Sequence, residues 1–128
     1  MLCSDIFAAA CNLIAESAGE TLSDDFQARA PYILSNFCGM AATADKHYRQ
    51  AFSLGVQPEF NRLLLESSAS FPLSDRFIPS AQAYLAAMLI SAENPELSKA
   101  LRENVQNDLL AAYGEIPATI HGIVNSYI

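Results

Sequence analysis

The chain has few basic residues for its length, and this shortage limits the partners it can bind. Its 128 residues hold 7 Lys and Arg against 14 Asp and Glu, so the net charge is −7. Nucleic-acid-binding domains neutralise phosphates with clustered Lys and Arg, and we therefore do not expect a nucleic acid as a direct ligand. The apolar runs are also much shorter than the roughly 20 residues of a membrane-spanning helix, so we expect no membrane partner.

Motifs that bind phosphates or metals are missing as well. The sequence has no glycine-rich phosphate loop and no Cys-x-x-Cys, and its two histidines, His47 and His121, are far apart. A Cys38–His47 catalytic dyad is conceivable, but Cys38 falls on an apolar helix stripe, where a thiol is inert. We expect no cofactor, no metal and no enzymatic activity.

Cysteine is scarce, and its count is odd. Cys3, Cys11 and Cys38 are placed on apolar helix faces, and we expect no signal peptide. These features favour reduced thiols packed in a core. We therefore expect the protein in a cytoplasm.

What the chain has in abundance is apolar, helix-forming sequence. The hydrophobic fraction is 52%, and only 5 Gly and 6 Pro interrupt it. Apolar residues recur at three- and four-residue spacing in four segments, each of which follows a capping residue. We predict a single all-α domain over residues 1–128, a bundle of four main helices that start after Ser4, Ser23, Ser74 and Asn94.

The four helices are expected to differ in their surroundings. A short turn after Gly19 predicts that the first two form an antiparallel hairpin, with a kink or a broken turn at Pro31. The third has the widest apolar stripe, so we expect it to be the central helix. The last should begin at Asn94-Pro95, an Asn cap followed by a proline, and end at Gly114, which closes a core of about residues 4–113.

Residues 43–73 are predicted to be a long connection. It could hold one or two short helices, such as one over Asp45–Leu54, and Phe60–Glu66 could be a strand or a helix turn. The run Lys46-His47-Tyr48-Arg49 is interpreted as a solvated loop, with a small phosphate-binding patch as the alternative. Long loops in compact domains often carry function.

Charge is unevenly distributed along the chain. Residues 1–25 hold five acids and no base, residues 26–80 hold five bases and four acids, and residues 81–128 have a charge of −3. An acidic end and a mildly basic middle could favour head-to-side contacts between copies. The simpler interpretation is charge solvated at the surface.

Two apolar segments are candidates for docking a partner. The string Phe71-Pro72-Leu73 could be an exposed elbow, or it could close the bottom of the bundle and lead into the third helix. The tail, residues 115–128, is apolar and nearly uncharged, whereas a free terminus is normally polar, so it should need a surface of its own core or of a neighbouring subunit. The candidate docking residues are Phe71, Pro72, Leu73, Ile116, Ile120, Ile123, Val124, Tyr127 and Ile128.

Residues 71–101, together with the N-terminal helical pair, resemble a known family. The run FPLSDRFIPSAQAYLAAMLISAENPELSKAL is similar to small all-helical head–tail connector, or neck adaptor, proteins of tailed phages and prophages. The shared pattern is an acidic or Pro-Leu loop, a helix at Ile78–Ile90, and a last helix that opens at Glu93-Asn94-Pro95. Roughly residues 43–62 depart from it, because they lack the proline-rich connector of the family.

The resemblance implies a structural role. Such adaptors form rings on the portal vertex, so the implied partners are further copies of the chain, the portal and tail-completion proteins. The implied location is the host cytoplasm during assembly and then the virion neck. A ring requires that one patch of a subunit meets a different patch of the next. Two other hypotheses remain open: a small helical protein-binding or regulatory module unrelated to phage, and an enzyme on a helical scaffold.

Overall fold

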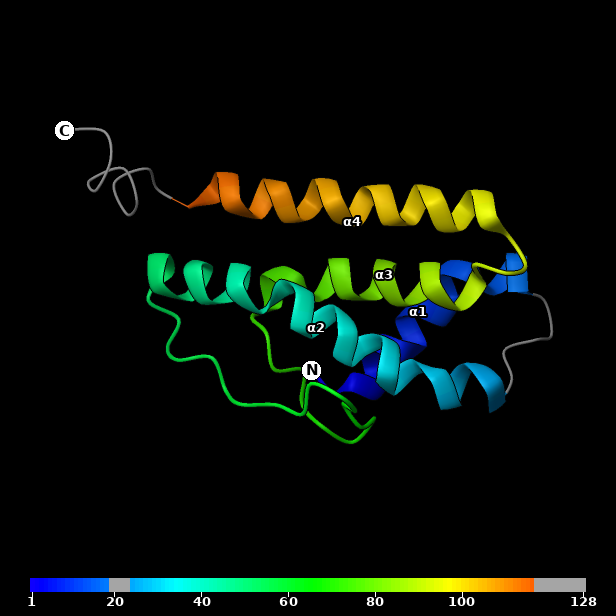
Figure 1. Cartoon of the computed structure of the whole chain (residues 1–128), viewed down its shortest axis with the longest axis horizontal. Helices are drawn as coiled ribbons and strands as arrows, with labels where there is room; N and C mark the ends of the chain where they lie inside the picture. The colour runs from blue at the N-terminus through cyan, green and yellow to red at the C-terminus, as the bar shows by residue number, and fades with distance from the viewer. Residues whose placement is uncertain (19–23, 117–128) are drawn as a thin grey trace.

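The computed structural model describes residues 1–18 and 24–116, and the regular secondary structure in these residues is helical (Figure 1). The elements in chain order are α1 (Cys3–Ala18), α2 (Asp24–Phe52), the 3₁₀ turn η1 (Asp75–Phe77), α3 (Ile78–Ile90) and α4 (Pro95–Glu115). One isolated antiparallel bridge joins Leu2 and Ser70. The prediction of an all-α bundle of four main helices is confirmed.

Helix α3 is the centre of the bundle, as its wide apolar stripe predicts. It packs against α1, α2 and α4, and Figure 1 shows it between α4 and the two N-terminal helices. Its side chains are buried on several faces, among them Tyr84, Leu85, Leu89 and Ile90. Helices α1 and α2 each pack more extensively on α3 than on each other, so the third helix joins the N-terminal pair to the bundle.

The sequence pattern places most of the core correctly. Ile6, Phe26, Phe37 and Leu85 are almost completely buried. Leu13 fits the three- and four-residue apolar spacing of α1, which predicts burial, but it is 53% exposed. The buried stripe of α1 is therefore narrower than the apolar spacing predicts.

Helix α2 is longer than expected, and this is the main correction to the predicted boundaries. It runs from Asp24 to Phe52 without a break, so residues 43–52 belong to the helix and are not part of the connection. The helix also continues through Pro31, which makes the predicted broken turn wrong. The carbonyl oxygen of Pro31 accepts a hydrogen bond from the Ser35 hydroxyl at 2.8 Å.

Residues 53–74 form an irregular connection that folds back along the bundle. Ser53 and Gly55 have positive φ angles of 54° and 90°, and this left-handed backbone reverses the chain after α2. The expected strand or helix turn at Phe60–Glu66 is absent from this described segment, which has a bend and otherwise irregular backbone there.

Main-chain hydrogen bonds attach the connection to the start of α1. The N–H groups of Cys3 and Ser4 donate to the carbonyls of Ala69 and Ser67, at 2.9 and 3.0 Å. The first N–H groups of a helix have no partner within it, and here the connection supplies carbonyls for them. The helix therefore begins at Cys3, one residue before the predicted cap at Ser4.

Helix α4 begins as predicted. The Asn94 side chain accepts a hydrogen bond from the Leu97 N–H at 3.1 Å, and Pro95 is the first helical residue. The helix ends at Glu115, one residue later than expected, and Ile116 is buried with 8% exposure. The rest of the predicted tail lies outside the described residues, including the candidates Ile120, Ile123, Val124, Tyr127 and Ile128.

Candidate functional site

The proposed docking elbow at residues 71–73 is part of the core. Phe71 is 8% exposed, Leu73 is 3% exposed, and Pro72 is also buried. Phe71 and Leu73 belong to the buried core cluster, so packing on the other core residues removes these apolar side chains from water. Residues 71–73 are thus not an exposed docking surface in this structure. Their burial agrees with the alternative, in which they pack on the bundle and lead into the third helix.

A buried carboxylate fixes the connection to α2. Asp45 is completely inaccessible to solvent, and it accepts hydrogen bonds from the Arg49 Nε at 2.7 Å, the Gln57 amide at 2.8 Å and the Ser74 N–H at 2.8 Å. We call these four residues the Asp45 cluster. Residues near both ends of the connection, Gln57 and Ser74, donate to this one side chain, which ties the irregular segment to α2.

The Asp45 cluster keeps its carboxylate charged. Burial alone raises the pKa of Asp45, but the hydrogen bonds from Gln57, Ser74 and Arg49 outweigh burial and leave the pKa below its ordinary value. Arg49 in turn donates to the carbonyls of Pro72, at 3.1 Å, and Val56, at 3.5 Å. A buried charge needs such complete pairing to be tolerated.

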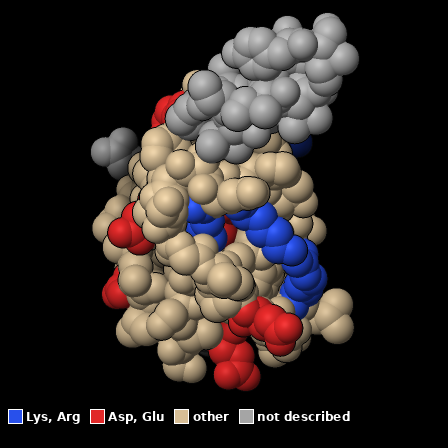
Figure 2. All heavy atoms as spheres, turned by 90° about the vertical axis from the view of Figure 1, so that its left-hand side faces the viewer, with Lys and Arg blue, Asp and Glu red and all other residues tan. Residues whose placement is uncertain are grey.

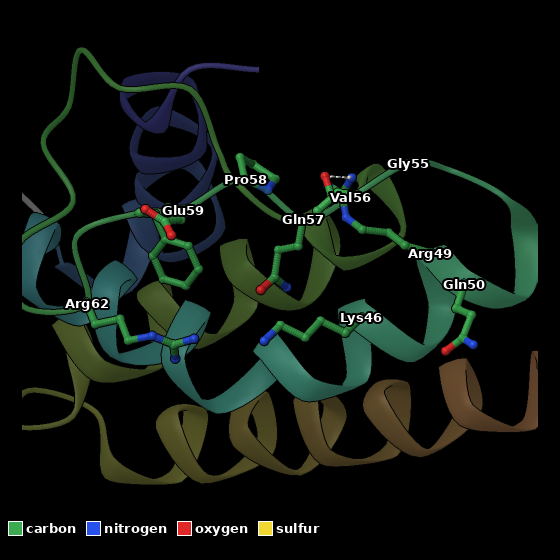
Figure 3. Close-up of a pocket in the computed structure, with 10 residues that line it drawn as sticks. Lys46, Arg49, Gln50, Gly55, Val56, Gln57, Pro58, Glu59 and Arg62 are labelled. Atoms are coloured by element: carbon green, nitrogen blue, oxygen red, sulfur yellow. Dashed lines mark hydrogen bonds between the residues drawn. The ribbon is translucent and has the colours of Figure 1, made fainter.

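Beside this cluster lies an open pocket between α2 and the connection. Its volume is about 720 Å³, and Figure 3 shows its wall. The lining residues come from two segments, Lys46, Arg49 and Gln50 of α2, and Gly55, Val56, Gln57, Pro58, Glu59, Phe60 and Arg62 of the connection. We call this space the cationic pocket, because three of its side chains are Lys or Arg.

The side chains of the run Lys46-His47-Tyr48-Arg49 lie on two different surfaces. Residues Lys46 and Arg49 line the cationic pocket. His47 and Tyr48 face the C-terminal part of α4. The ring centres of His47 and Tyr113 are 6.4 Å apart, and the Tyr48 hydroxyl donates a hydrogen bond to Glu115. The run is helical, so the solvated-loop interpretation is wrong, and its four residues do not form a single patch.

The C-terminal ends of α2 and α4 meet in a partly exposed aromatic surface. The ring centres of Tyr48 and Phe52 are 4.7 Å apart. The side chains of Phe52, Leu54 and Tyr113 are 41%, 48% and 44% exposed. We call Tyr48, Phe52, Leu54 and Tyr113 the aromatic end. A hollow of about 590 Å³ adjoins it, lined in part by Tyr48 and Leu54.

Figure 2 faces this end of the molecule. Uncharged residues make up most of the visible described surface, with a band of Lys and Arg atoms across it and Asp and Glu atoms towards its margins. Exposed large apolar side chains gathered at one place commonly mark an interaction site.

An ionic cluster fixes the last turn of α4 at the same end. Arg76 binds Asp108 at 3.1 Å and Glu115 at 2.8 Å, and Ser80 also donates to Asp108. These contacts raise the pKa of the Arg76 guanidinium, chiefly through Glu115, and the hydrogen bond from Arg76 lowers the pKa of Glu115. The C-terminal end of α4 is therefore held by side chains of η1 and α3.

Cys3 and Cys38 are buried core thiols as expected, whereas Cys11 is only partly buried and lies outside the core. Burial raises the pKa of Cys3 to about 11, and it also raises the pKa values of Cys11 and Cys38. Such thiols are poor nucleophiles at neutral pH because the thiolate is scarce. Within residues 1–18 and 24–116, no group of three or more His, Cys, Asp or Glu side chains is placed to hold a metal ion.

Only part of the cationic pocket is recognisable from the sequence. Lys46 and Arg49 are recognisable because they are one turn apart on a helix. Gln57 and Arg62 carry no signal of their own, because their position depends on the reversal at Ser53 and Gly55.

Comparisons of the chain with protein-family models, curated proteins and solved structures gave no match. In the described part of the chain, no helix combines the length and the apolar character needed to cross a membrane.

Proposed function

We propose that the chain is a non-enzymatic assembly protein, and that its aromatic end binds the apolar tail, residues 117–128, of a neighbouring copy. The observation that carries this proposal is the exposure of Phe52, Leu54 and Tyr113 beside the point where the tail begins. Single exposed apolar residues are ordinary, but three of them on one surface can bind an apolar segment. The aromatic end and the tail are therefore complementary in character.

The composition of the tail supports this pairing. Its 12 residues have no Asp, Glu, Lys or Arg side chain, and they include Ile120, Ile123, Val124, Tyr127 and Ile128. An extended segment of this length reaches about 40 Å, which is enough to cross to another copy. Burial of these side chains would drive the association, because the hydrophobic effect scales with the apolar area removed from water.

The assembly that we propose is a ring between a phage portal and the tail. The support for this choice is the resemblance of residues 71–101 to head–tail connector proteins. The partners would then be identical copies, the portal and tail-completion proteins. Genes for portal, capsid or tail proteins beside the gene for this chain would distinguish this assembly from an unrelated protein-binding module.

The test compares the full chain with residues 1–116. This truncation keeps Glu115, which binds Arg76, and Ile116, which is buried, so the bundle should fold as before. Sedimentation and electron microscopy should show concentration-dependent oligomers or rings of the full chain and monomers of the truncated chain. Equal oligomers of both chains would contradict tail docking, and a strict monomer of the full chain at high concentration would contradict the assembly role.

A substitution on the aromatic end gives a second, independent test. Leu54→Asp should weaken assembly at least tenfold, because it places a charge where the apolar tail docks. Leu13→Asp is the matched control, because Leu13 on α1 has a similar exposure, 53% against 48%. An equal effect of both substitutions would show that the aromatic end is not the docking surface.

A further inference from the structure

We propose that the cationic pocket is a binding site for a phosphate monoester, held between Lys46 and Arg62. This proposal is independent of the assembly role, because the pocket lies between α2 and residues 55–62 and not at the aromatic end. It follows from the placement of two positive charges, neither of them in an ion pair among the described residues, in the lining of one pocket.

The two cations come from different segments and approach each other over the surface of α2. The Arg62 Nη1 is 3.9 Å from the position that a Cβ would take on Gly39, so the guanidinium lies above that residue. Lys46 is two turns further along, about 10 Å in the helix direction. Side chains on a helix lean towards its N-terminus, and Figure 3 accordingly shows the Lys46 and Arg62 side chains pointing towards one another.

Neither cation is neutralised by the described residues. Arg49, the third cation of the pocket, has its charge matched by Asp45 at 2.7 Å. Lys46 and Arg62 make no ion pair within residues 1–18 and 24–116, and Arg62 instead stacks on the Phe60 ring, 5.0 Å from its centre. Stacking of this kind leaves the edge of the guanidinium, with its N–H donors, free for a ligand.

The acid that lines the pocket does not bridge the two cations. Figure 3 shows the Glu59 carboxylate on the side of the pocket away from Lys46. Like charges that converge without a counter-charge repel each other, and an anion placed between them converts this repulsion into two charge-assisted hydrogen bonds. The arrangement therefore favours an anionic ligand.

The charge and shape of the pocket indicate which anion. Two positive charges match a dianion, and a phosphate monoester carries nearly two negative charges at pH 7, whereas a carboxylate or a phosphodiester carries one. A guanidinium edge and an ammonium group together suit the oxygens of a phosphate. The rest of the pocket is wide enough for an organic group, which would lie along Val56 and Pro58.

The wall of the pocket is built to keep this geometry. Gln57 donates from its amide both to the Ala42 carbonyl at 2.9 Å and to Asp45 at 2.8 Å. Arg49 holds the Val56 carbonyl from the other side. The wall at Val56 and Gln57 is thus attached to α2 without a ligand, and a preorganised site loses less free energy on binding.

The test titrates the full chain with inorganic phosphate and with phosphoserine, at constant ionic strength, by NMR chemical-shift perturbation and calorimetry. Binding should perturb the amides of residues 46, 55–57 and 59–62. It should strengthen severalfold from pH 5.5 to pH 7.5 as the dianion forms. Acetate, a monoanion, should bind at least tenfold more weakly. Absence of phosphate binding, or equal binding of acetate, would overturn the proposal.

Three variants assign the site. Lys46→Gln and Arg62→Gln should each weaken phosphate binding roughly tenfold, the effect of losing one charge-assisted hydrogen bond. Glu59→Gln should strengthen it severalfold by removing a nearby negative charge. Lys99→Gln, on the exposed face of α4, is the matched control and should leave binding unchanged. If the two pocket variants bind phosphate as well as the control does, the phosphate is held elsewhere, and the assignment is wrong.

Discussion

Helix α2 contains two aspartate–arginine pairs with the same four-residue spacing and very different surroundings. In Asp25–Arg29 the side chains are 66% and 42% exposed, and the closest N–O distance is 3.3 Å. In Asp45–Arg49 they are 0% and 14% exposed, and the distance is 2.7 Å. The spacing produces the pair in both cases, but the connection over Asp45 determines how much the second pair matters.

The comparison extends to the role of each pair. Arg29 also donates to the Met88 carbonyl at 3.1 Å, which joins α2 to α3 at the surface. Asp45, by contrast, holds an entire irregular segment, and that segment forms one wall of the cationic pocket. A change at the buried pair should therefore affect both stability and ligand binding, whereas a change at the exposed pair should lower stability only slightly and leave ligand binding unchanged.

The largest expected effect is that of Asp45→Ala. It removes the acceptor for three donors and leaves Arg49 without its counter-charge in a mostly buried position. Breaking a buried pair in this way costs about 3–5 kcal/mol of unfolding free energy. Asp25→Ala, the matched control on the same helix, should cost about 0.5 kcal/mol. Urea denaturation of both variants measures the difference, and similar losses would mean that burial does not separate the two pairs.

A smaller effect is expected from Asp45→Asn, and it should depend on pH. The pKa of Asp45 is lower in the folded chain than its ordinary value of 3.8. A lowered pKa contributes stability that is complete above the ordinary value and is lost as the pH falls through the folded one. The unfolding free energy of the wild type should therefore exceed that of the variant by a constant amount from pH 7 to pH 5, and this difference should shrink below about pH 4. A difference that grows in acid would reverse the assigned direction of the pKa shift.

The elements of this fold are recognisable in the sequence where a local signal decides them. The Asn94-Pro95 start of α4 is one example, because the cap and the proline act within one turn. The central position of α3 is another, because an apolar stripe that wide cannot be buried by one neighbour. In the structure Ala81, Leu85 and Leu89 of α3 are all completely buried.

The boundary of α2 and the candidate site could not be predicted in the same way. Asp45 reads as the start of a new helix, because an aspartate is a common cap. It lies instead inside a continuous helix, paired with Gln57 and Ser74, which are 12 and 29 residues away. Contacts over such separations leave no periodic pattern, so the Asp45 cluster, Arg62 and the pocket between them depend on tertiary packing.

The next expected effect concerns the ionic cluster at the C-terminal end of α4. Arg76→Gln loses ion pairs with Asp108 and Glu115 that are only partly shielded from water, so it should cost about 1 kcal/mol. Arg102→Gln on the exposed face of α4 is the control and should cost less. Hydrogen exchange should locate the change, with faster exchange at residues 112–116 in the Arg76 variant. Unchanged exchange there would show that Arg76 does not hold the last turn.

The smallest expected effect on stability is that of the double variant Lys46→Gln and Arg62→Gln. Both side chains are exposed and have no ion pair among the described residues, so the unfolding free energy without phosphate should stay within about 0.5 kcal/mol of the wild type. A slight gain is the favoured direction, because the variant removes a repulsion between like charges.

With excess phosphate the wild type should become more stable, since a ligand that binds only the folded state stabilises it by mass action. The double variant should not respond, and the thermal midpoints of both proteins with and without phosphate measure this contrast. An equal rise in both proteins would place the effect of phosphate outside the pocket. A large loss of stability in the double variant would show that these two cations, like Arg49, support the fold.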